Sequence, residues 1–372
     1  MVRRDNRSDK ILFGTMLALS GFGLLMIYSA TKNAGSFSME RQMIFVAAGL
    51  LLYFLASNVD YREYRSWVPV VSIVVLISLM VVFLFEPVNG AQRWIPLGFF
   101  KLQPAEFAKV VVIVALASLL APPIRADMER PPLTWATIGK ALLITAIPAY
   151  LILREPDLGT TMVFFFIVYV MLFAAGASWR QMVTLGISGV LAGIVVWQAN
   201  LLEDYQLDRI RVLFDPTVDP QGIGYNLAQS KLAIGSGQIF GSGLFQGTQT
   251  NFEYVPEQET DFIFTAVGEQ LGFIGGLLVL VAFSIIIWRL LVIAVNARDR
   301  FGALIAAGTA AMMMFHVFIN IGMTVGITPV TGLPLPFLSQ GGSFYMSMTL
   351  ALGIANSIWL MRTPVPGENQ LT

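Results

Sequence analysis

Long apolar runs are the feature that most limits what this chain can fold into. A helix needs roughly 20 mostly apolar residues to cross about 30 Å of hydrocarbon, and runs near that length recur along the chain. They are expected to start near Ile11, Met43, Val68, Phe107, Thr137, Leu158, Gln181, Phe262, Phe301 and Gly342, and the last ends near Met361. The predicted fold is therefore an all-α polytopic integral membrane protein, a single membrane domain over residues 1–372 with about ten transmembrane helices.

The composition supports exposure to lipid. Hydrophobic residues make up 56% of the chain and charged residues 12%, about half of the roughly 25% charged residues usual in soluble domains. One soluble core could not hide so much apolar surface, so the excess must face lipid. The net charge is zero, so the chain lacks the excess of basic residues that is typical of nucleic-acid-binding proteins. The absence of cysteine excludes disulfides, thiolate catalysis and cysteine metal sites.

The basic residues predict an orientation. The segment Met1–Lys10 is polar and basic, and an apolar run follows it without a small-residue cleavage site, so we expect an uncleaved first span. Lys and Arg are more frequent in the predicted loops on the N-terminal side of the membrane, which is the usual bias of the cytoplasmic side. We therefore predict a multi-pass membrane protein with both termini in the cytoplasm.

A long loop separates the seventh and eighth predicted spans on the outer side. It covers about 60 residues, Asn200–Asp261, and loops of this length are usually functional or disordered. Within it, Tyr225–Ile234 has the amphipathic spacing of a helix, which predicts a short helix lying on the membrane. Gly235–Gly243 follows no predicted strand, so its glycines indicate tight backbone turns and not a nucleotide-binding fold. We expect this loop to be folded.

An acidic stretch leads directly into the eighth span. In Pro256–Phe264, Asp261 is expected to lie at the boundary between water and the hydrocarbon of the membrane. Glu257 of the same stretch is a further candidate for substrate binding. Partial desolvation raises the pKa of a carboxyl group toward neutrality, as a general base requires. The alternative is that Thr260 or Asp261 caps the following helix, and the two roles can coexist.

Charged residues also begin the fourth span. Glu106 and Lys109 lie three residues apart on one helix face, after Pro104, which suits a first helical turn, and Gln103, a candidate for substrate binding. Charges at membrane depth normally face a partner or a wet cavity. The pair therefore either neutralises itself for structural reasons or lines a polar cavity in which Lys109 meets an anion such as pyrophosphate.

Other outer-side candidates for substrate binding also have structural alternatives. Asp157, in a segment it shares with Arg154, contacts substrate or caps the sixth helix. Arg93 is either a phosphate ligand or an interfacial anchor. Arg209 and Arg211 alternate faces if the chain is extended there, so at most one is expected to reach a given ligand.

Two features precede the last span. His316, the only histidine, shares a helix face with Asn320, and we favour a buried hydrogen-bonded pair over catalysis. Thr331–Ser343 holds three glycines, two prolines and the two candidates Ser339 and Ser343. Irregular backbone at membrane depth is tolerated where it is buried in protein or lines a cavity, so this segment is predicted to be a pocket wall. All the candidates except the helix of His316 lie toward the predicted outer face.

These segments resemble the family of shape, elongation, division and sporulation proteins, and the resemblance covers nearly the whole chain. The matching patterns are Gln92–Trp94, Gln103–Lys109, Glu155–Thr160, Gly235–Gly243, Pro256–Phe264, Gly268–Gly272 and Ser339–Ser343. Pro329–Pro336 is more similar to the elongation branch than to the division branch. Two residues depart from the family pattern: Glu259 stands where histidine is usual, and Gln340 where tyrosine is usual.

The resemblance implies a bacterial peptidoglycan glycosyltransferase of the cytoplasmic membrane that acts during cell elongation. It would polymerise lipid II into glycan strands at the outer face, release undecaprenyl pyrophosphate, and work with a class B penicillin-binding protein as transpeptidase. The family's essential aspartate falls on Asp261, and its polar pair on Glu106 and Lys109. A divalent cation, Mg²⁺ or Mn²⁺, would suit the leaving group, but no metal-ligand spacing is evident.

The expected mechanism is one displacement with inversion. Asp261 takes the proton of the acceptor hydroxyl, and Lys109, with Arg93 or Arg209, stabilises the departing pyrophosphate. Two other functions fit the same features. A flippase or other transporter of lipid-linked precursors would also use polar groups within spans and broken helices, although the candidates cluster toward one face. A scaffold that only positions the transpeptidase would not need Asp261.

Overall fold

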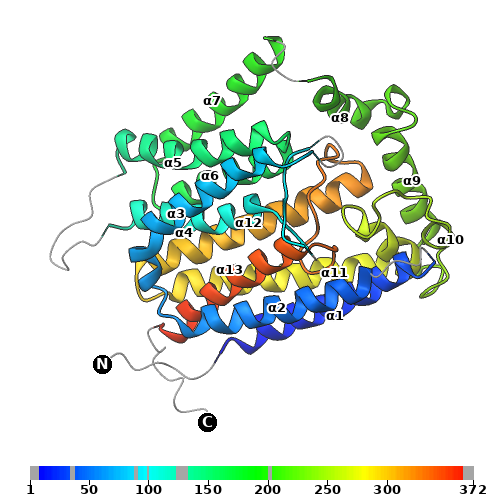
Figure 1. Ribbon diagram of the computed structural model, residues 1–372, viewed down its shortest axis with the longest axis horizontal. Coiled ribbons are helices and arrows are strands. Elements are labelled where there is room, and N and C mark those ends of the chain that lie inside the picture. The colour runs from blue at the N-terminus through cyan, green and yellow to red at the C-terminus, as the bar shows by residue number, and fades with distance from the viewer. Residues whose placement is uncertain are drawn as a thin grey trace.

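The computed structural model describes residues 8–33, 38–87, 91–98, 100–122, 133–199 and 203–362. Most of Met1–Lys10 and part of the inner loop between residues 122 and 136, which carry some of the basic residues behind the predicted orientation, lie outside these ranges. Within the described residues, ten long helices form the bundle (Figure 1). They are α1 (Lys10–Thr31), α2 (Ser38–Asn58), α3 (Glu63–Val81), α4 (Pro104–Leu120), α5 (Trp135–Arg154), α6 (Leu158–Ala174), α7 (Trp179–Gln198), α11 (Ile263–Asn296), α12 (Arg300–Val325) and α13 (Gly342–Leu360).

The polytopic helical fold is confirmed, and each predicted span corresponds to one helix. Among the described residues, seven helices are long and apolar enough to cross a membrane, and α6 is a shorter apolar helix. The remaining two, α4 and α13, have 17 and 19 residues and bury most of their side chains. They run beside the longer helices (Figure 1). Their polar residues face protein instead of lipid, which is why their composition alone marks them less clearly.

The central helix is α12, whose residues are mostly buried and which packs against α4, α6, α11 and α13. The closest pairing elsewhere joins α13 to α2. There a Cβ atom on Gly353 would lie 2.6 Å from the Tyr53 carbonyl oxygen, so the two backbones meet where no side chain intervenes. Small residues allow such close approach between membrane helices.

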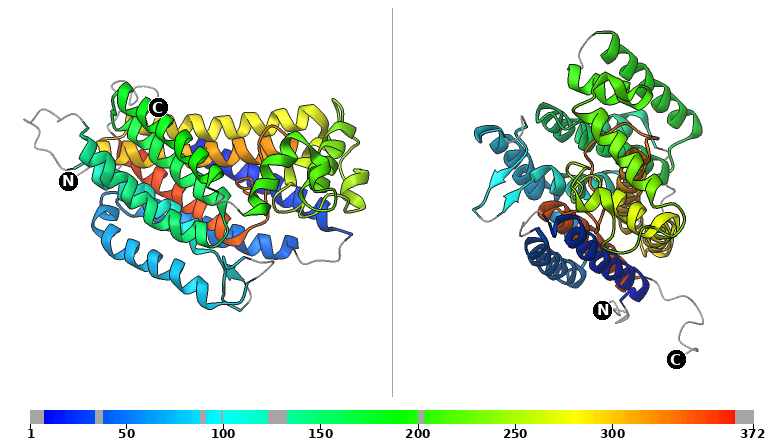
Figure 2. Two further views of the ribbon diagram at one scale, coloured as in Figure 1. Left: turned by 90° about the horizontal axis from the view of Figure 1, so that it is seen from above. Right: turned by 90° about the vertical axis from the view of Figure 1, so that its right-hand side faces the viewer.

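One end of the bundle carries the additional elements. The short helices α8 (Asp204–Phe214), α9 (Ile223–Ser236) and α10 (Thr248–Asn251) lie there, with η2 (Pro216–Val218), while α1 begins and α13 ends at the opposite end (Figure 1). Between α3 and α4, η1 (Val82–Leu84) precedes an antiparallel hairpin of β1 (Ile95–Pro96) and β2 (Lys101–Leu102). Figure 2 (right) looks onto this end. We call it the outer end.

The predicted helix in the long loop is confirmed as α9, but its predicted setting is wrong. Leu227 and Ala233 are buried, and the Ser230 hydroxyl donates to the carbonyl of Thr324 in α12 at 2.6 Å. The face expected to meet the membrane therefore packs on the bundle, because α11 and α12 offer α9 an apolar surface of protein.

The glycine segment of the loop supports a break in α11. Gly272 interrupts the helix with φ 64° and ψ −159°, a conformation that glycine adopts without a Cβ clash. Backbone groups of residues 238–243 pair with those freed at the break: the amides of Ser242 and Gly243 donate to Glu269 and Gln270, and the amide of Phe273 donates to Gln238. The turns predicted for Gly235–Gly243 thus satisfy buried polar backbone of α11.

Candidate functional site

Asp261 lies at the outer end, immediately before α11. The N-cap of α11 is Phe262, without a side-chain cap bond, so the capping interpretation is wrong for Asp261. It is also wrong for Thr260, whose hydroxyl bonds to Glu257 instead. The backbone carbonyl of Asp261 accepts a 2.7 Å hydrogen bond from Asn320 of α12. Among the described residues, the partly exposed Asp261 carboxylate has no hydrogen-bond donor.

A second set of charged residues comes from the segment between α3 and α4 and the segment between α5 and α6. Arg93, just before β1, donates to the carbonyls of Glu155 and Pro156, and its guanidinium lies 3.8 Å from the Asp157 carboxylate. Asp157 also caps α6 by accepting from the amide and hydroxyl of Thr160 at 3.0 Å each. Arg93 is therefore turned into the protein, and only 20% of its side chain is exposed.

Arg209, from α8, completes the site. Its guanidinium donates to the Thr331 carbonyl at 2.8 Å, within the irregular segment before α13, and its buried Nε has no partner among the described residues. Arg211 instead is exposed and pairs with Asp208 at 3.1 Å. One of the two arginines reaches the site, as expected, although the segment is a helix and not extended.

The charged groups act on one another, and we refer to them together as the outer cluster. Its members are Arg93, Glu155, Asp157, Arg209 and Asp261. Burial, and then the exposed Glu257 nearby, raise the pKa of Asp261 to about 7 against the opposing effect of Arg209 and Arg93. Burial and the positive charge of Arg93 lower the pKa of Arg209. The outer cluster thus holds three carboxyl groups and two guanidinium groups, and the two guanidinium groups are the donors that it offers to an anion.

Glu155 was missed by the sequence analysis, which selected Arg154 in its place. Arg154 is exposed at the end of α5 and makes no contact that joins it to the outer cluster. Glu155 is fully buried, both carboxylate oxygens lack a hydrogen-bond partner in the described residues, and burial with the charge of Asp157 raises its pKa to about 8. The sequence signals were a charged residue in the short connection between two apolar spans and its place in the family pattern Glu155–Thr160.

The polar pair of α4 lies deeper and is closed to solvent. Lys109 bonds to Glu106 at 2.8 Å and is 0% exposed, so the structure shows the mutually neutralising pair. Lys109 also contacts His316 Nε2 at 3.0 Å, and His316 Nδ1 lies 3.3 Å from the Pro334 carbonyl. His316 and Asn320 are buried, as predicted, but the expected bond between them is wrong, because each instead holds the segment before α13.

That segment packs against the bundle and forms a wall beside Asp261, and its role as the wall of a pocket stays a prediction. Ser339 and Ser343 are buried; Ser339 accepts from the Leu335 amide, and Ser343 accepts from the Gln103 amide at 2.9 Å. A Cβ atom on Gly332 would lie 3.1 Å from the carboxylate of Asp261. Gln103, Ser339 and Ser343 thus shape the wall with backbone-directed bonds.

The two departures from the family pattern meet in this wall. The amide of Gln340 donates to the carbonyl of Glu259 at 2.8 Å. The contact joins the segment before α13 to the segment before α11 through their backbones. This hydrogen bond uses backbone atoms only, so it can form with Glu259 and Gln340 as it could with the usual histidine and tyrosine of the family.

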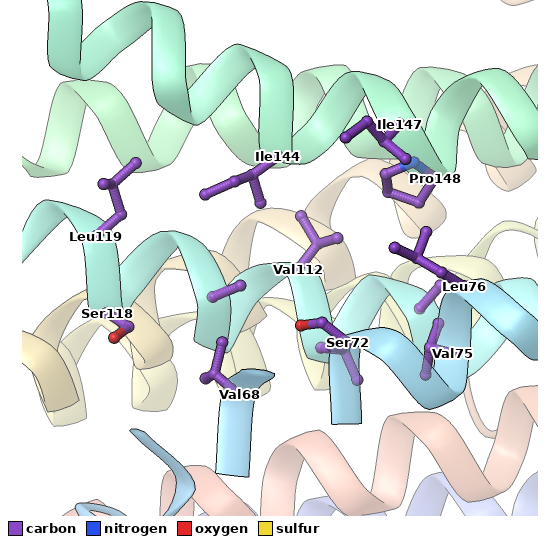
Figure 3. A pocket seen from close by; sticks show the side chains of 13 residues that line it. Val68, Ser72, Val75, Leu76, Val112, Ser118, Leu119, Ile144, Ile147 and Pro148 are labelled. Atoms are coloured by element: carbon purple, nitrogen blue, oxygen red, sulfur yellow. The ribbon is translucent and has the colours of Figure 1, made fainter. Parts of the chain in front are cut away.

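An apolar cavity of about 390 Å³ lies between α3, α4 and α5 (Figure 3). Val68, Leu76, Val112, Ile144 and Pro148 are among the side chains that line it. It lies within the spans, and Ala108 of its wall precedes Lys109 in α4. A cavity with this lining suits a hydrocarbon chain better than a polar ligand.

The acidic residues do not form a cage for a cation. Among the described residues there is no group of three or more His, Cys, Asp or Glu side chains placed to hold a metal ion. Asp157 is engaged by Arg93 and Thr160. The site offers two carboxyl groups of near-neutral pKa, Asp261 and Glu155, beside two arginines, and of these two carboxyl groups only that of Asp261 is partly exposed.

Comparisons with known proteins relate the whole chain to one family. Residues 9–363 match the family of cell cycle proteins that unites FtsW, RodA and SpoVE. The chain is 38% identical to the peptidoglycan glycosyltransferase MrdB of Escherichia coli over 94% of this chain and 93% of that protein.

Two solved structures are similar in fold. One is a chain in a peptidoglycan synthase complex studied for its coordination of polymerization and crosslinking, with a TM-score of 0.80, 29% identity, and coverage of 95% of this chain and 98% of that chain. The other is the rod shape-determining protein RodA of Thermus thermophilus, with a TM-score of 0.70, 27% identity, and coverage of 97% and 99%.

Proposed function

The chain belongs to the FtsW, RodA and SpoVE family and is a peptidoglycan glycosyltransferase, and on this premise we propose that Asp261 is its general base and lipid II its substrate. The observation that carries the proposal is that the Asp261 carboxylate accepts no hydrogen bond from the described residues, while Asn320 fixes the Asp261 backbone at the outer end. A carboxylate with a pKa of about 7 is half deprotonated at neutral pH and retains the basicity that proton abstraction requires.

The proposed reaction is a single displacement with inversion. The Asp261 carboxylate accepts the proton of the acceptor sugar hydroxyl, and the hydroxyl oxygen forms a bond to the anomeric carbon of the donor. The bond from that carbon to the pyrophosphate oxygen breaks, and its electron pair leaves with the pyrophosphate. No group of this chain becomes covalently attached, so one base and one site for the leaving anion are sufficient.

The leaving pyrophosphate is proposed to bind between Arg93 and Arg209. Both guanidinium groups face the outer cluster, and the buried Nε of Arg209 has no acceptor among the described residues. Guanidinium groups bind phosphate oxygens with two parallel hydrogen bonds, and a partly desolvated setting strengthens them. Lys109, enclosed by Glu106 and His316, would instead position the wall that carries Pro334.

The apolar cavity is proposed to hold a polyprenyl tail. Its lining side chains come from three spans (Figure 3). They include Pro148 of α5, a residue that has no backbone N–H group. Holding the tail inside the protein would present the sugar at the outer end in a fixed orientation, which converts an encounter into a positioned reaction.

A class B penicillin-binding protein is the proposed partner. Support comes from the similarity to a chain of a peptidoglycan synthase complex in which polymerization is coordinated with crosslinking. We also propose that the chain is a multi-pass protein of the bacterial cytoplasmic membrane with both termini in the cytoplasm. On this orientation the outer cluster faces outward. A role in elongation is supported by the pattern of Pro329–Pro336 and by the similarity to RodA.

The decisive experiment is a polymerisation assay with labelled lipid II. The purified chain, with and without its transpeptidase partner, would produce glycan polymer resolved by size, and Asp261→Asn would produce none while folding normally. Polymer from Asp261→Asn at the wild-type rate would remove the assignment of the base. Glu257→Gln serves as the matched control, because it removes a nearby carboxylate that is exposed at the rim.

A further inference from the structure

A buried carboxylate that the proposed reaction does not use lies in α11, before its break at Gly272. Glu269 is 1% exposed. It accepts hydrogen bonds from the amide of Gln249 at 2.7 Å, and from the amide and hydroxyl of Thr250 at 2.9 and 2.7 Å. Hydrogen bonds to an ionised acceptor are the stronger class. Glu269 therefore anchors the short helix α10, which lies beside α11 (Figure 1).

The approach of α10 to α11 is close. A Cβ atom on Gly247, which precedes α10, would lie 2.6 Å from the carboxylate of Glu269, so a side chain at this position would displace that carboxylate. The amide and hydroxyl of Ser242 donate to the Glu269 carbonyl at 2.9 and 3.1 Å. The long loop is thus tied to α11 at both the backbone and the side chain of Glu269, and the place of Thr250 is fixed as a result.

Gln258 connects the anchored helix to the turn that carries Asp261. Its side chain is 3% exposed, and its amide donates to the hydroxyl of Thr250 at 3.2 Å and to that of Thr265 at 2.8 Å. The Thr265 hydroxyl in turn donates to the Phe262 carbonyl at 2.6 Å. One side chain, in the segment just before Asp261, therefore bridges α10 and the first turn of α11.

The backbone of this turn needs support from its surroundings. The carbonyl of Glu257 accepts hydrogen bonds from the amides of Asp261 and Phe262, and Glu257 has a φ of 51°. A residue with a side chain adopts this left-handed conformation at a cost, and it persists where the neighbouring structure holds it. Asn320 holds the turn from α12, and Gln258 holds it from α10.

We propose that Gln258 is a positioning residue for the polymerisation reaction: by joining Thr250, and through it Glu269, to the start of α11, it fixes the turn that places the Asp261 carboxylate. The inference rests on the proposed role of Asp261 as the base. The amide of Gln258 is engaged by two threonines and acts on the reaction only through the backbone of the turn. Its loss should therefore slow the chemical step and leave binding of lipid II unchanged.

The test compares Thr250→Val with Thr250→Ser in the purified full-length chain, by initial rates with labelled lipid II. Thr250→Val removes the hydroxyl that links Gln258 to Glu269, and it should lower kcat about tenfold with little change in KM. Thr250→Ser keeps the hydroxyl and should retain most of the rate. Gln258→Met, similar in length but without the amide, should match Thr250→Val. Thr145→Val is the control, because the hydroxyl of this buried threonine bonds to Ala141 of its own helix.

Rates are expressed per folded protein, measured by size-exclusion chromatography, and Asp261→Asn is assayed in parallel. Wild-type kcat in Thr250→Val and Gln258→Met, with Asp261→Asn inactive, would overturn the positioning role and leave the base assignment intact. Equal loss of kcat in Thr250→Val, Thr250→Ser and Thr145→Val would also overturn it, because it would indicate a general packing effect. Full activity of Asp261→Asn would instead remove the base assignment and the positioning role together.

Discussion

The side-chain amide of Asn320 donates a 2.7 Å hydrogen bond to the backbone carbonyl of Asp261. The same amide donates to the carbonyl of Leu333 at 2.8 Å. A residue of the buried central helix therefore ties the proposed base to the wall that faces it. The carboxylate of Asp261 is left for substrate while its backbone is fixed from the protein interior.

This relationship predicts that Asn320→Ala lowers kcat about tenfold with little change in KM, since two buried carbonyls lose their donor and the base is less well positioned. The change would be measured as initial rates of glycan polymerisation against lipid II concentration. Thr324→Val is the control, a buried substitution one turn further along α12. Equal losses in both variants would indicate a general packing effect and not positioning of Asp261.

The pH dependence of activity should report the titration of Asp261. The base acts when deprotonated, so polymerisation should fall as pH decreases through about 7, the raised pKa of Asp261. Glu257→Gln removes a like charge that raises this pKa, so the profile should move to lower pH. Arg209→Gln removes a positive charge that lowers it, so the profile should move to higher pH. Shifts in the same direction would contradict the electrostatic assignment.

Binding of the leaving group should depend on Arg209 and not on Arg211. Arg209→Gln should weaken product inhibition by undecaprenyl pyrophosphate about 10- to 100-fold, the effect of losing hydrogen bonds from a charged group. Arg211→Gln, which removes the same charge from the exposed side of α8, should have little effect. Inhibition constants for the two variants would decide the matter, and similar values would exclude a specific contact with Arg209.

The buried pair of α4 should behave as a structural unit. Lys109→Met leaves the Glu106 carboxylate buried without its partner, and breaking such a pair costs about 3–5 kcal/mol. Thermal unfolding in detergent should therefore show a large loss. The double variant with Glu106→Gln should recover most of the stability, because no unpaired charge remains. Lys101→Met, at an exposed position, is the control, and no recovery in the double variant would contradict mutual neutralisation.

The apolar cavity should govern the use of the lipid tail. Ile144→Trp would fill space between α3, α4 and α5 (Figure 3) and should raise KM for full-length lipid II about tenfold, since burial of several methylene groups is lost. Precursors with shortened tails should be less affected. Leu143→Trp places the same side chain on the lipid-facing side of α5, where Leu143 is 61% exposed, so it should leave KM unchanged.

Much of this architecture follows from local sequence. The ten spans were predicted within a few residues because a helix in hydrocarbon satisfies its own backbone groups, so its length and position follow largely from the apolar run. The helix start at Asp157 and the turns of Gly235–Gly243 were readable for a related reason. Capping and left-handed backbone conformations are decided by residues close in the chain.

The composition of the site depended on tertiary structure. Sequence reasoning named Asp261, Arg93 and Arg209, which the structure brings together at one end of the bundle, but it preferred Arg154 to Glu155 and paired His316 with Asn320. Which side of a turn faces the interior, and which partner a buried group meets, is set by how α4, α6 and α12 pack and by where the segment before α13 lies. Two of these contacts, Lys109 with His316 and Arg209 with Thr331, join residues more than 100 positions apart, so no local pattern could specify them.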